Sequence, residues 1–221
     1  MALNDPLPEP LPDDPLAMAA DWLAQAWQRA DQPNPNAMVL ATVDADGAPA
    51  ARVVLCKGIE PDPGVVRFVS NYHSRKGAAL AHEPRAALVF HWDHAHRQVR
   101  IEGRVLRASP ADSDSYFASR PWASQLGAHA SAQSQPVASR AELVARLDAV
   151  TQRYGTEPGQ GPEAMHRPAH WGGYVLWVSA VELWTEGSAR IHDRARWTRK
   201  LALQPDGSVN AGVWQATRLQ P

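Results

Sequence analysis

The sequence predicts an α+β protein that is mainly β and is built on a β-barrel. Short runs of apolar and β-branched residues follow one another between residues 37 and 107, and turn residues separate most of them. Helical patterns precede these runs and return between residues 110 and 153. The first strands have no crossover helices between them, which disfavours a doubly wound parallel sheet.

The first element should be an amphipathic helix. Asp14 suits the N-cap and Pro15 the first helical position. Apolar residues then recur at helical spacing: Leu16, Ala19, Ala20, Leu23 and Trp27. Residues 1–12 are rich in proline and have no periodic pattern, so we expect a flexible arm before this helix.

Strand patterns begin at residue 37. Residues 37–44 and 49–57 read as two strands joined by the turn "ADGA", and residues 65–71 as a third. The stretch "SRKGAALAHEP" predicts a short helix that ends before Pro84. Strands at residues 85–92 and 97–107 should follow. The second of these has an apolar side and a polar side, as a half-solvated strand or one lining a site would.

The second half of the chain alternates between the two kinds of structure. Residues 110–130 and 139–153 have helical composition, and Ser139 with Glu142 forms a capping box. A loop over residues 154–170 leads to strand patterns in "GGYVLWVSAVELW", "ARIHDRARWTR" and "GVWQATRL", and "LALQPDGSVNAG" should extend a hairpin. Because no composition break occurs, residues 13–221 are predicted to form a single domain.

Composition narrows the function classes. The 221 residues are 44% hydrophobic and 20% charged, and 22 Lys and Arg residues against 23 Asp and Glu residues give a net charge of −1. This balance argues against nucleic acid as the main partner, so any basic site must be local. The single cysteine, Cys56, cannot form an internal disulfide, and no secretory leader is evident, which favours the cytoplasm. No apolar run approaches the roughly 18 residues of a membrane span.

No metal site is predicted. His91, His94 and His96 lie close in sequence, but no cysteine or carboxylate cluster completes a ligand set. A glycine-rich fingerprint for a dinucleotide or a P-loop is also missing from the sequence. If the protein binds phosphate, it must do so with side chains of another pattern.

Basic and hydroxyl residues recur in four stretches that could hold anions: "RVVLCK", "SRK", "SRPWASQ" and "RIHDR". In "SRPWASQ", Ser and Arg flank an expected helix start, where N–H donors and the helix dipole favour phosphate. If "RIHDR" is a strand, Arg190, His192 and Arg194 share one face and need a counter-charge. Arg52 and Lys57 are five residues apart, so they reach one ligand only if a bulge or the strand end intervenes.

Together these stretches resemble the pyridoxamine 5′-phosphate oxidase family of flavin enzymes. The resemblance runs from about Asp14 to Pro221 and rests on the order and spacing of many motifs. They include "AMVLATVDADGAP", "RVVLCK", "SNYHSRK", "RQVRIEG", "YFASRPWASQLGAHAS", "QS" at residues 133–134, "WGGY", "VELW", "RIHDR" and "RLQP".

The resemblance implies an FMN-binding split β-barrel with flanking helices and a homodimer with FMN at the subunit interface. The implied FMN-binding residues are Arg52, Val53, Leu55, Lys57, Val69, Ser70, Arg75, Lys76, Gln98, Gln133, Ser134, Trp184 and Arg194. The implied substrate-binding residues are Lys57, Tyr116, Arg120, Ser124, Arg190 and His192. Of these, Arg190 and His192 are the implied catalytic pair, because they would orient the substrate and handle protons near the oxidised carbon.

The activity that the resemblance implies is oxidation of pyridoxamine and pyridoxine 5′-phosphate by O2 to pyridoxal 5′-phosphate, with release of H2O2, and of NH3 from the amine. Two alternatives stay open. One is a split-barrel flavoprotein with another substrate, of the phenazine type or dependent on deazaflavin. The other is a protein that binds flavin or pyridoxal phosphate without catalysis. The complete substrate-phosphate set favours the oxidase.

Overall fold

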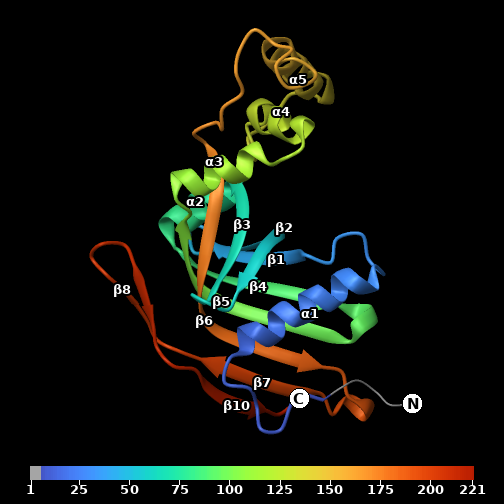
Figure 1. The fold of residues 1–221 in the computed structure, drawn as a ribbon, viewed down its shortest axis with the longest axis vertical. Coiled ribbons are helices and arrows are strands. Elements are labelled where there is room, and N and C mark those ends of the chain that lie inside the picture. Colours follow the sequence, from blue (N-terminus) through green and yellow to red (C-terminus); the bar gives the residue numbers. More distant parts are fainter. Residues whose placement is uncertain (1–5) are drawn as a thin grey trace.

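The computed structural model describes residues 6–221, and its framework is an antiparallel β-sheet that closes on itself (Figure 1). The α-helices are α1 (Pro15–Arg29), α2 (Arg75–His82), α3 (Pro110–Ala118), α4 (Trp122–Ala130) and α5 (Arg140–Tyr154). The first strands are β1 (Ala37–Val43), β2 (Pro49–Glu60), β3 (Val65–Asn71), β4 (Arg85–Trp92) and β5 (Arg97–Arg107). The later strands are β6 (Trp171–Thr185), β7 (Asp193–Thr198), β8 (Leu201–Leu203), β9 (Val209–Ala211) and β10 (Gln215–Leu219). Single 3-10 turns lie at Asp93–Ala95 and Ser188–Arg190.

The barrel closes through β6. In the described part of the chain the neighbours run β6, β3, β2, β1, β4, β5 and back to β6, which confirms the predicted barrel and its mainly β class. β6 pairs with a different strand in each half: its first half pairs with β3 and its second half with β7. β10 pairs with β7 outside the barrel. A single strand therefore connects the α3 end of the molecule to the β7 end.

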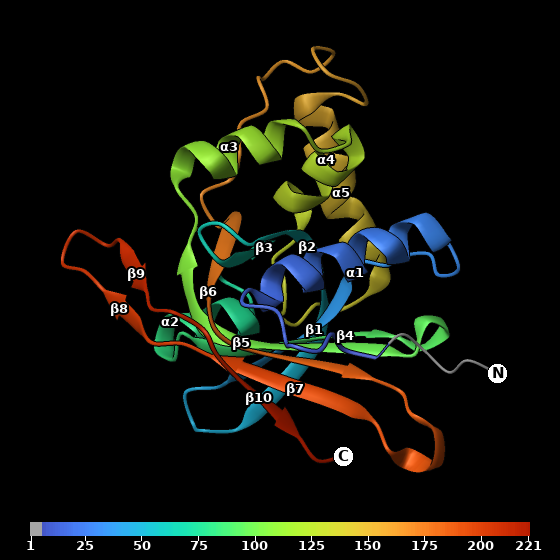
Figure 2. The ribbon, with the colours of Figure 1, turned by 60° about the horizontal axis from the view of Figure 1, so that its bottom comes forward.

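The helices gather unevenly around this barrel. Figures 1 and 2 show α3, α4 and α5 together at one end, α1 across the barrel, and the β8–β9 hairpin projecting from the side. This hairpin is the extension that "LALQPDGSVNAG" predicts. Apolar side chains from α1 and the strands fill the core, among them Leu16, Phe68, Leu88 and Leu183, each fully buried.

The helix predicted at the N-terminus is present, with one difference in its buried face. Asp14 caps α1 by accepting a hydrogen bond from Leu16 N at 2.9 Å, and Leu16 and Ala19 are buried as expected. Trp27, however, is 53% exposed, and Trp22 packs into the core in its place. The helix is rotated so that its tightest stripe passes through Trp22, where Arg97 also covers the indole ring.

The proline-rich start was expected to be a flexible arm over residues 1–12. Residues 1–5 lie outside the described residues. From Pro6 onward the chain packs against β7: Leu7 is 3% exposed, its N–H donates to Asp193 Oδ2 at 2.8 Å, and Trp197 Nε1 donates to Pro12 O at 2.8 Å. Residues 6–12 therefore have fixed contacts, in contrast to that expectation.

The helical stretch at residues 110–130 is two helices. α3 ends at Ala118 and α4 begins at Trp122, because Pro121 lacks the N–H that a continuous helix would need. The break turns the chain at Arg120.

None of the described helices is long and apolar enough to cross a membrane. Residues 6–221 also contain no group of three or more His, Cys, Asp or Glu side chains placed to hold a metal ion.

Candidate active site

A cleft of about 410 Å³ lies where β2, β3 and α2 meet the break between α3 and α4. It is the point of convergence for most of the residues predicted to bind ligands. Those that line it are Val53, Leu55, Lys57, Val69, Ser70, Lys76, Tyr116, Arg120, Ser124 and Gln133.

Lys57 reaches the cleft at a bulge in β2. Across the β2–β3 ladder Cys56 pairs with Phe68 and Gly58 with Arg67, so Lys57 is the extra residue. This is the irregularity that the spacing of Arg52 and Lys57 requires. The ammonium of Lys57 lies 5.6 Å from the ring centroid of Tyr116, on α3. The bulge thus brings a strand cation and a helix phenol to one wall of the cleft.

Arg120 is the most unusual group in the cleft. Its Nη1 atom is buried and has no hydrogen-bond partner among the described residues. The guanidinium carbon lies 4.5 Å from the ring centroid of Trp171, and burial lowers the pKa of Arg120. A buried donor without an acceptor is costly, so this geometry fits an anionic ligand. Ser124, in the first turn of α4, lines the same cleft and adds a hydroxyl beside a helix N-terminus.

Lys76 forms the opposite side of the cleft. Ser74 caps α2, and Lys76 Nζ donates to Gln133 Oε1 at 2.6 Å and to Ser74 Oγ at 3.2 Å. Burial, and then the cation of Arg52, lower the pKa of Lys76. α2 comes this close to β3 only because residue 77 is glycine, since a Cβ there would lie 2.2 Å from the Tyr72 carbonyl oxygen.

Three cations in the cleft therefore lack a counter-charge. No ion pair within residues 6–221 involves Lys57, Lys76 or Arg120. Unpaired cations that converge in a concave site with hydroxyl and amide groups favour phosphorylated ligands. The residues present therefore fit a phosphate-bearing cofactor and a phosphate-bearing substrate.

Three other predicted FMN-binding residues lie beside the cleft. Arg52 donates to Thr42 Oγ1 at 2.7 Å and lies close enough to Lys76 to affect its pKa. Ser134 follows Gln133 in a left-handed conformation, with φ of 72°. Arg75 is turned away, since its Nε donates to Asp44 Oδ2 at 2.8 Å, and this bond raises the pKa of Arg75.

The remaining predicted residues form a second group at the far end of β6. Gln98 pairs with Trp184 across the β5–β6 ladder, and Trp184 pairs with Arg194 across β6–β7. The ring of His192 lies 4.7 Å from that of Trp184. From Trp171, in the cleft, to Trp184 the strand advances 13 residues, or roughly 40 Å along its course.

The prediction of a strand through "RIHDR" is wrong for the residues before Asp193. β7 begins only at Asp193, while Ser188–Arg190 form a 3-10 turn in which Ala189 and Arg190 have φ of 54° and 64°. The chain must reverse here between β6 and β7, so side chains do not alternate until Asp193. Arg190, His192 and Arg194 therefore do not share a strand face. His192 is held instead by its Nδ1, which accepts from Gly187 N at 3.2 Å.

Several cleft residues escaped prediction. They are Val54, Asn71, Pro121 and Trp171. Asn71 is 5% exposed, accepts from His73 N at 2.7 Å and ends β3 at the cleft. Trp171 is the first residue of the "WGGY" motif, which was the signal that the sequence offered, and its ring lies under Arg120 in the structure.

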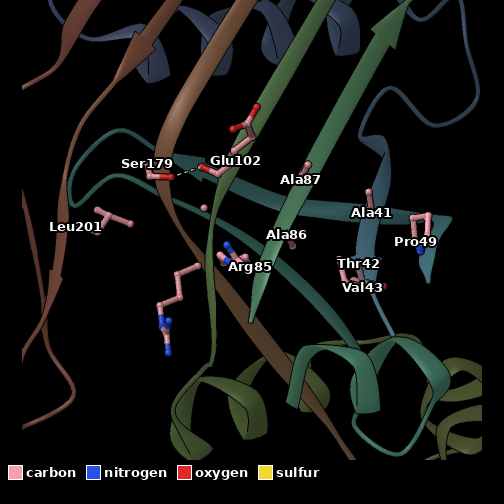
Figure 3. Close-up of a pocket in the computed structure, with 12 residues that line it drawn as sticks. Ala41, Thr42, Val43, Pro49, Arg85, Ala86, Ala87, Glu102, Ser179 and Leu201 are labelled. Carbon is pink, nitrogen blue, oxygen red and sulfur yellow. Dashed lines mark hydrogen bonds between the residues drawn. The ribbon is translucent and has the colours of Figure 1, made fainter. Parts of the chain in front are cut away.

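A larger hollow, of about 610 Å³, lies on the outside of β1, β4 and β5 beneath Leu201 (Figure 3). Two of its three charged residues are already paired, Arg85 with Glu83 at 2.7 Å and Glu102 with Arg196 at 2.8 Å, and the third is Arg104. Among the described residues that line it, none belongs to the predicted site. The smaller cleft, with its unpaired cations, is therefore the candidate active site.

Comparisons with known proteins identify the family of the chain. Residues 25–154 match the family model for pyridoxamine 5′-phosphate oxidase, and residues 171–221 match that for the pyridoxine 5′-phosphate oxidase C-terminal dimerisation region. A pyridoxine/pyridoxamine 5′-phosphate oxidase of Burkholderia cenocepacia is 48% identical over 94% of this chain and 89% of its own. The Paracoccus denitrificans protein of the same name is 44% identical over 95% of this chain and 96% of its own.

Solved structures show the same fold. PhzG from Burkholderia lata, in complex with tetrahydrophenazine-1-carboxylic acid, superposes with a TM-score of 0.84 at 26% identity over the whole of both chains. A pyridoxamine 5′-phosphate oxidase-related, FMN-binding protein from Nostoc punctiforme has a TM-score of 0.68 at 16% identity, covering 94% of this chain and 98% of its own.

Fold and site thus define an oxidoreductase of the split-barrel flavoprotein class. Within that class, the chain belongs to the pyridoxamine 5′-phosphate oxidase family. Its C-terminal region, which matches a dimerisation region, supports a homodimer.

Proposed function

We propose that the protein oxidises pyridoxamine 5′-phosphate and pyridoxine 5′-phosphate to pyridoxal 5′-phosphate, with FMN as cofactor and O2 as acceptor. H2O2 is the second product, and the amine substrate also releases NH3. The observation that carries this proposal is the buried, unpartnered Nη1 of Arg120 in a cleft that also holds Lys57 and Lys76. In this role the enzyme serves vitamin B6 biosynthesis or salvage in the cytoplasm.

The cleft divides into two anion-binding sides. Lys57, Tyr116, Arg120 and Ser124 surround the α3–α4 break and would hold the substrate phosphate. Lys76, Ser70 and Gln133, with Arg52 and Ser134 beside them, would hold FMN, and Val53, Leu55 and Val69 offer it apolar contact. Arg75 is also assigned to FMN, and it must break its ion pair with Asp44 before it can bind the cofactor.

Bound FMN would supply two-electron oxidation and pass the electrons to O2. The protein's contribution is to hold the C4′ carbon of the substrate in position and to neutralise two phosphates. Arg190 and His192 would orient the pyridine ring and manage the proton at this carbon. With Nδ1 of His192 accepting from Gly187 N, its other ring nitrogen, Nε2, is the atom free to face a ligand.

A homodimer would bring the two groups together. Gln98, Trp184, Arg190, His192 and Arg194 lie too far along β6 to reach the cleft of their own chain. The second chain of a two-fold dimer would supply this group to the first chain's cleft, and the first chain's group to the second. FMN would then lie at the interface between the two chains.

The similarity to PhzG favours a second candidate, oxidation of a phenazine precursor. The ligand named for that structure is a carboxylic acid without phosphate, whereas this cleft has a full substrate-phosphate set. A peroxide assay on the purified yellow protein distinguishes the two. We expect H2O2 with both phosphorylated vitamers and none with the dephosphorylated forms. Peroxide from a dihydrophenazine alone would contradict the proposal, and a yellow protein that makes no peroxide would indicate a binding protein.

A further inference from the structure

A buried carboxylate lies behind the second group of predicted ligand residues. Glu182, on β6, is 6% exposed. Its Oε1 accepts from Nε and Nη2 of Arg194 at 3.2 and 2.8 Å, and its Oε2 accepts from Nη1 of Arg100 at 3.1 Å. Both carboxylate oxygens are thus occupied by cations from the neighbouring strands.

This arrangement fixes the guanidinium of Arg194. The bonds from Nε and Nη2 converge on one carboxylate oxygen, Oε1, and so restrict the orientation of the planar group. A third bond runs from Nη1 to the Gln220 carbonyl oxygen at 3.0 Å. Arginine has five N–H donors, so one on Nη1 and one on Nη2 have no acceptor in the described residues. With its side chain 26% exposed, Arg194 presents these two donors at an accessible surface.

We infer that Glu182 is a positioning residue for the flavin site: it holds Arg194 so that its two remaining donors are fixed for FMN. The inference rests on the proposed function, which assigns Arg194 and its ladder partner Trp184 to FMN. A fixed guanidinium loses less conformational entropy when the ligand binds than a free one would. Removing the carboxylate should therefore weaken FMN binding although Glu182 is not itself assigned to the ligand.

The chain offers a matched control on the same sheet. Glu102, on β5, also pairs with two arginines, Arg100 at 3.5 Å and Arg196 at 2.8 Å. It has no contact with Arg194 and faces the outer hollow, where Ser179 bonds its backbone (Figure 3). Loss of the Glu102 charge removes two ion pairs that do not include Arg194. One of them shares Arg100 with Glu182, but both bonds from Arg194 to Glu182 stay in place.

The test is the FMN dissociation constant, measured from free-flavin fluorescence during serial dilution of the full-length holoenzyme. We expect Glu182→Gln to raise it at least about tenfold, the size of a lost charge-assisted hydrogen bond. Glu102→Gln should change it by less than about twofold. In an Arg194→Gln background, Glu182→Gln should add less than about twofold, because its effect passes through Arg194.

Arg194→Lys covers the case in which Glu182→Gln does not fold. Lysine keeps the charge but cannot form the two-bond contact, so it should raise the constant by a similar factor. An unchanged FMN dissociation constant in Glu182→Gln or in Arg194→Lys would overturn this inference but not the proposed function. Two further results would overturn the inference. One is a double variant in which the fold-changes of the FMN dissociation constant for Glu182→Gln and Arg194→Gln multiply. The other is a Glu102→Gln variant that raises this constant as much as Glu182→Gln does. A wild-type chain that binds no FMN would overturn the proposed function as well.

Discussion

At the scale of single residues, the site is defined by cations without partners. Arg120, Lys57 and Lys76 stay unpaired in one cleft although most other arginines of the described chain, such as Arg67 and Arg218, form ion pairs. Unpaired charge in a concave surface disfavours folding unless a ligand offsets it. These residues therefore report function more directly than the buried core does.

The Arg120 side chain should contribute binding more than catalysis. We expect Arg120→Met to raise KM for pyridoxamine 5′-phosphate by about 10- to 100-fold, because a charge-assisted bond to phosphate acts in ground and transition states alike. The unfolding midpoint should not fall, since methionine keeps the contact with Trp171 and removes a buried unpartnered donor. Steady-state kinetics and thermal unfolding check both statements. A large fall in kcat at unchanged KM would contradict the assignment.

Arg190 should behave in the opposite way. It belongs to the turn before β7 and is assigned to the substrate ring and not to FMN. Arg190→Ala should therefore lower kcat by at least about 100-fold while the flavin absorbance of the purified protein stays that of wild type. Near-normal turnover, or loss of the yellow colour, would show that this role is misassigned.

Cys56 should be chemically silent in the native state. Burial raises the pKa of its thiol to about 11, and the side chain is 3% exposed. At pH 8 only about one thiol in a thousand would be ionised. We expect no reaction with a disulfide reagent over minutes, and full reaction after unfolding. Rapid labelling of the folded protein would contradict the core packing around β2.

At the scale of elements, alternation in the sequence predicted the strands well, but could not predict their interruptions. The hairpins, the capped helices α1 and α2 and the β8–β9 extension follow from local chemistry. The bulge at Lys57 and the turn at Ser188–Arg190 depend on how β2 and β6 pair with distant strands. Trp27 shows the same limit. The sequence of the helix allows either of two apolar stripes to face the core, and packing against the barrel decides which one is buried.

The turn between β6 and β7 should depend on Gly187. A Cβ there would lie 1.7 Å from the Ile191 carbonyl oxygen, and its N–H holds His192. Gly187→Ala should lower the free energy of unfolding by about 2 kcal/mol or more and reduce turnover. In the control, Gly207→Ala, φ is positive but nothing lies within 4 Å, so only a smaller loss of stability, of about 1 kcal/mol, is expected. Equal effects of the two substitutions on turnover would show that the turn does not position the site.

At the scale of the whole molecule, the candidate ligand residues form two groups at opposite ends of β6. The family resemblance implied ligand roles for residues in both groups, but not the separation of the groups, because sequence order says nothing about the course of a 15-residue strand in a barrel. The family's C-terminal dimerisation region covers Trp184 and Arg194, and the other family model covers all of the cleft residues except Trp171. Completion of one site by two chains is therefore the central claim.

The most direct test is complementation between two impaired chains. Arg120→Met weakens substrate binding in the cleft and Arg190→Ala disables the second group, so a heterodimer of these variants has one site with both defects and one with neither. Isolated with two affinity tags and assayed below the wild-type KM, it should recover about half of wild-type activity per dimer. Activity no higher than that of either parent homodimer would contradict a site shared between chains.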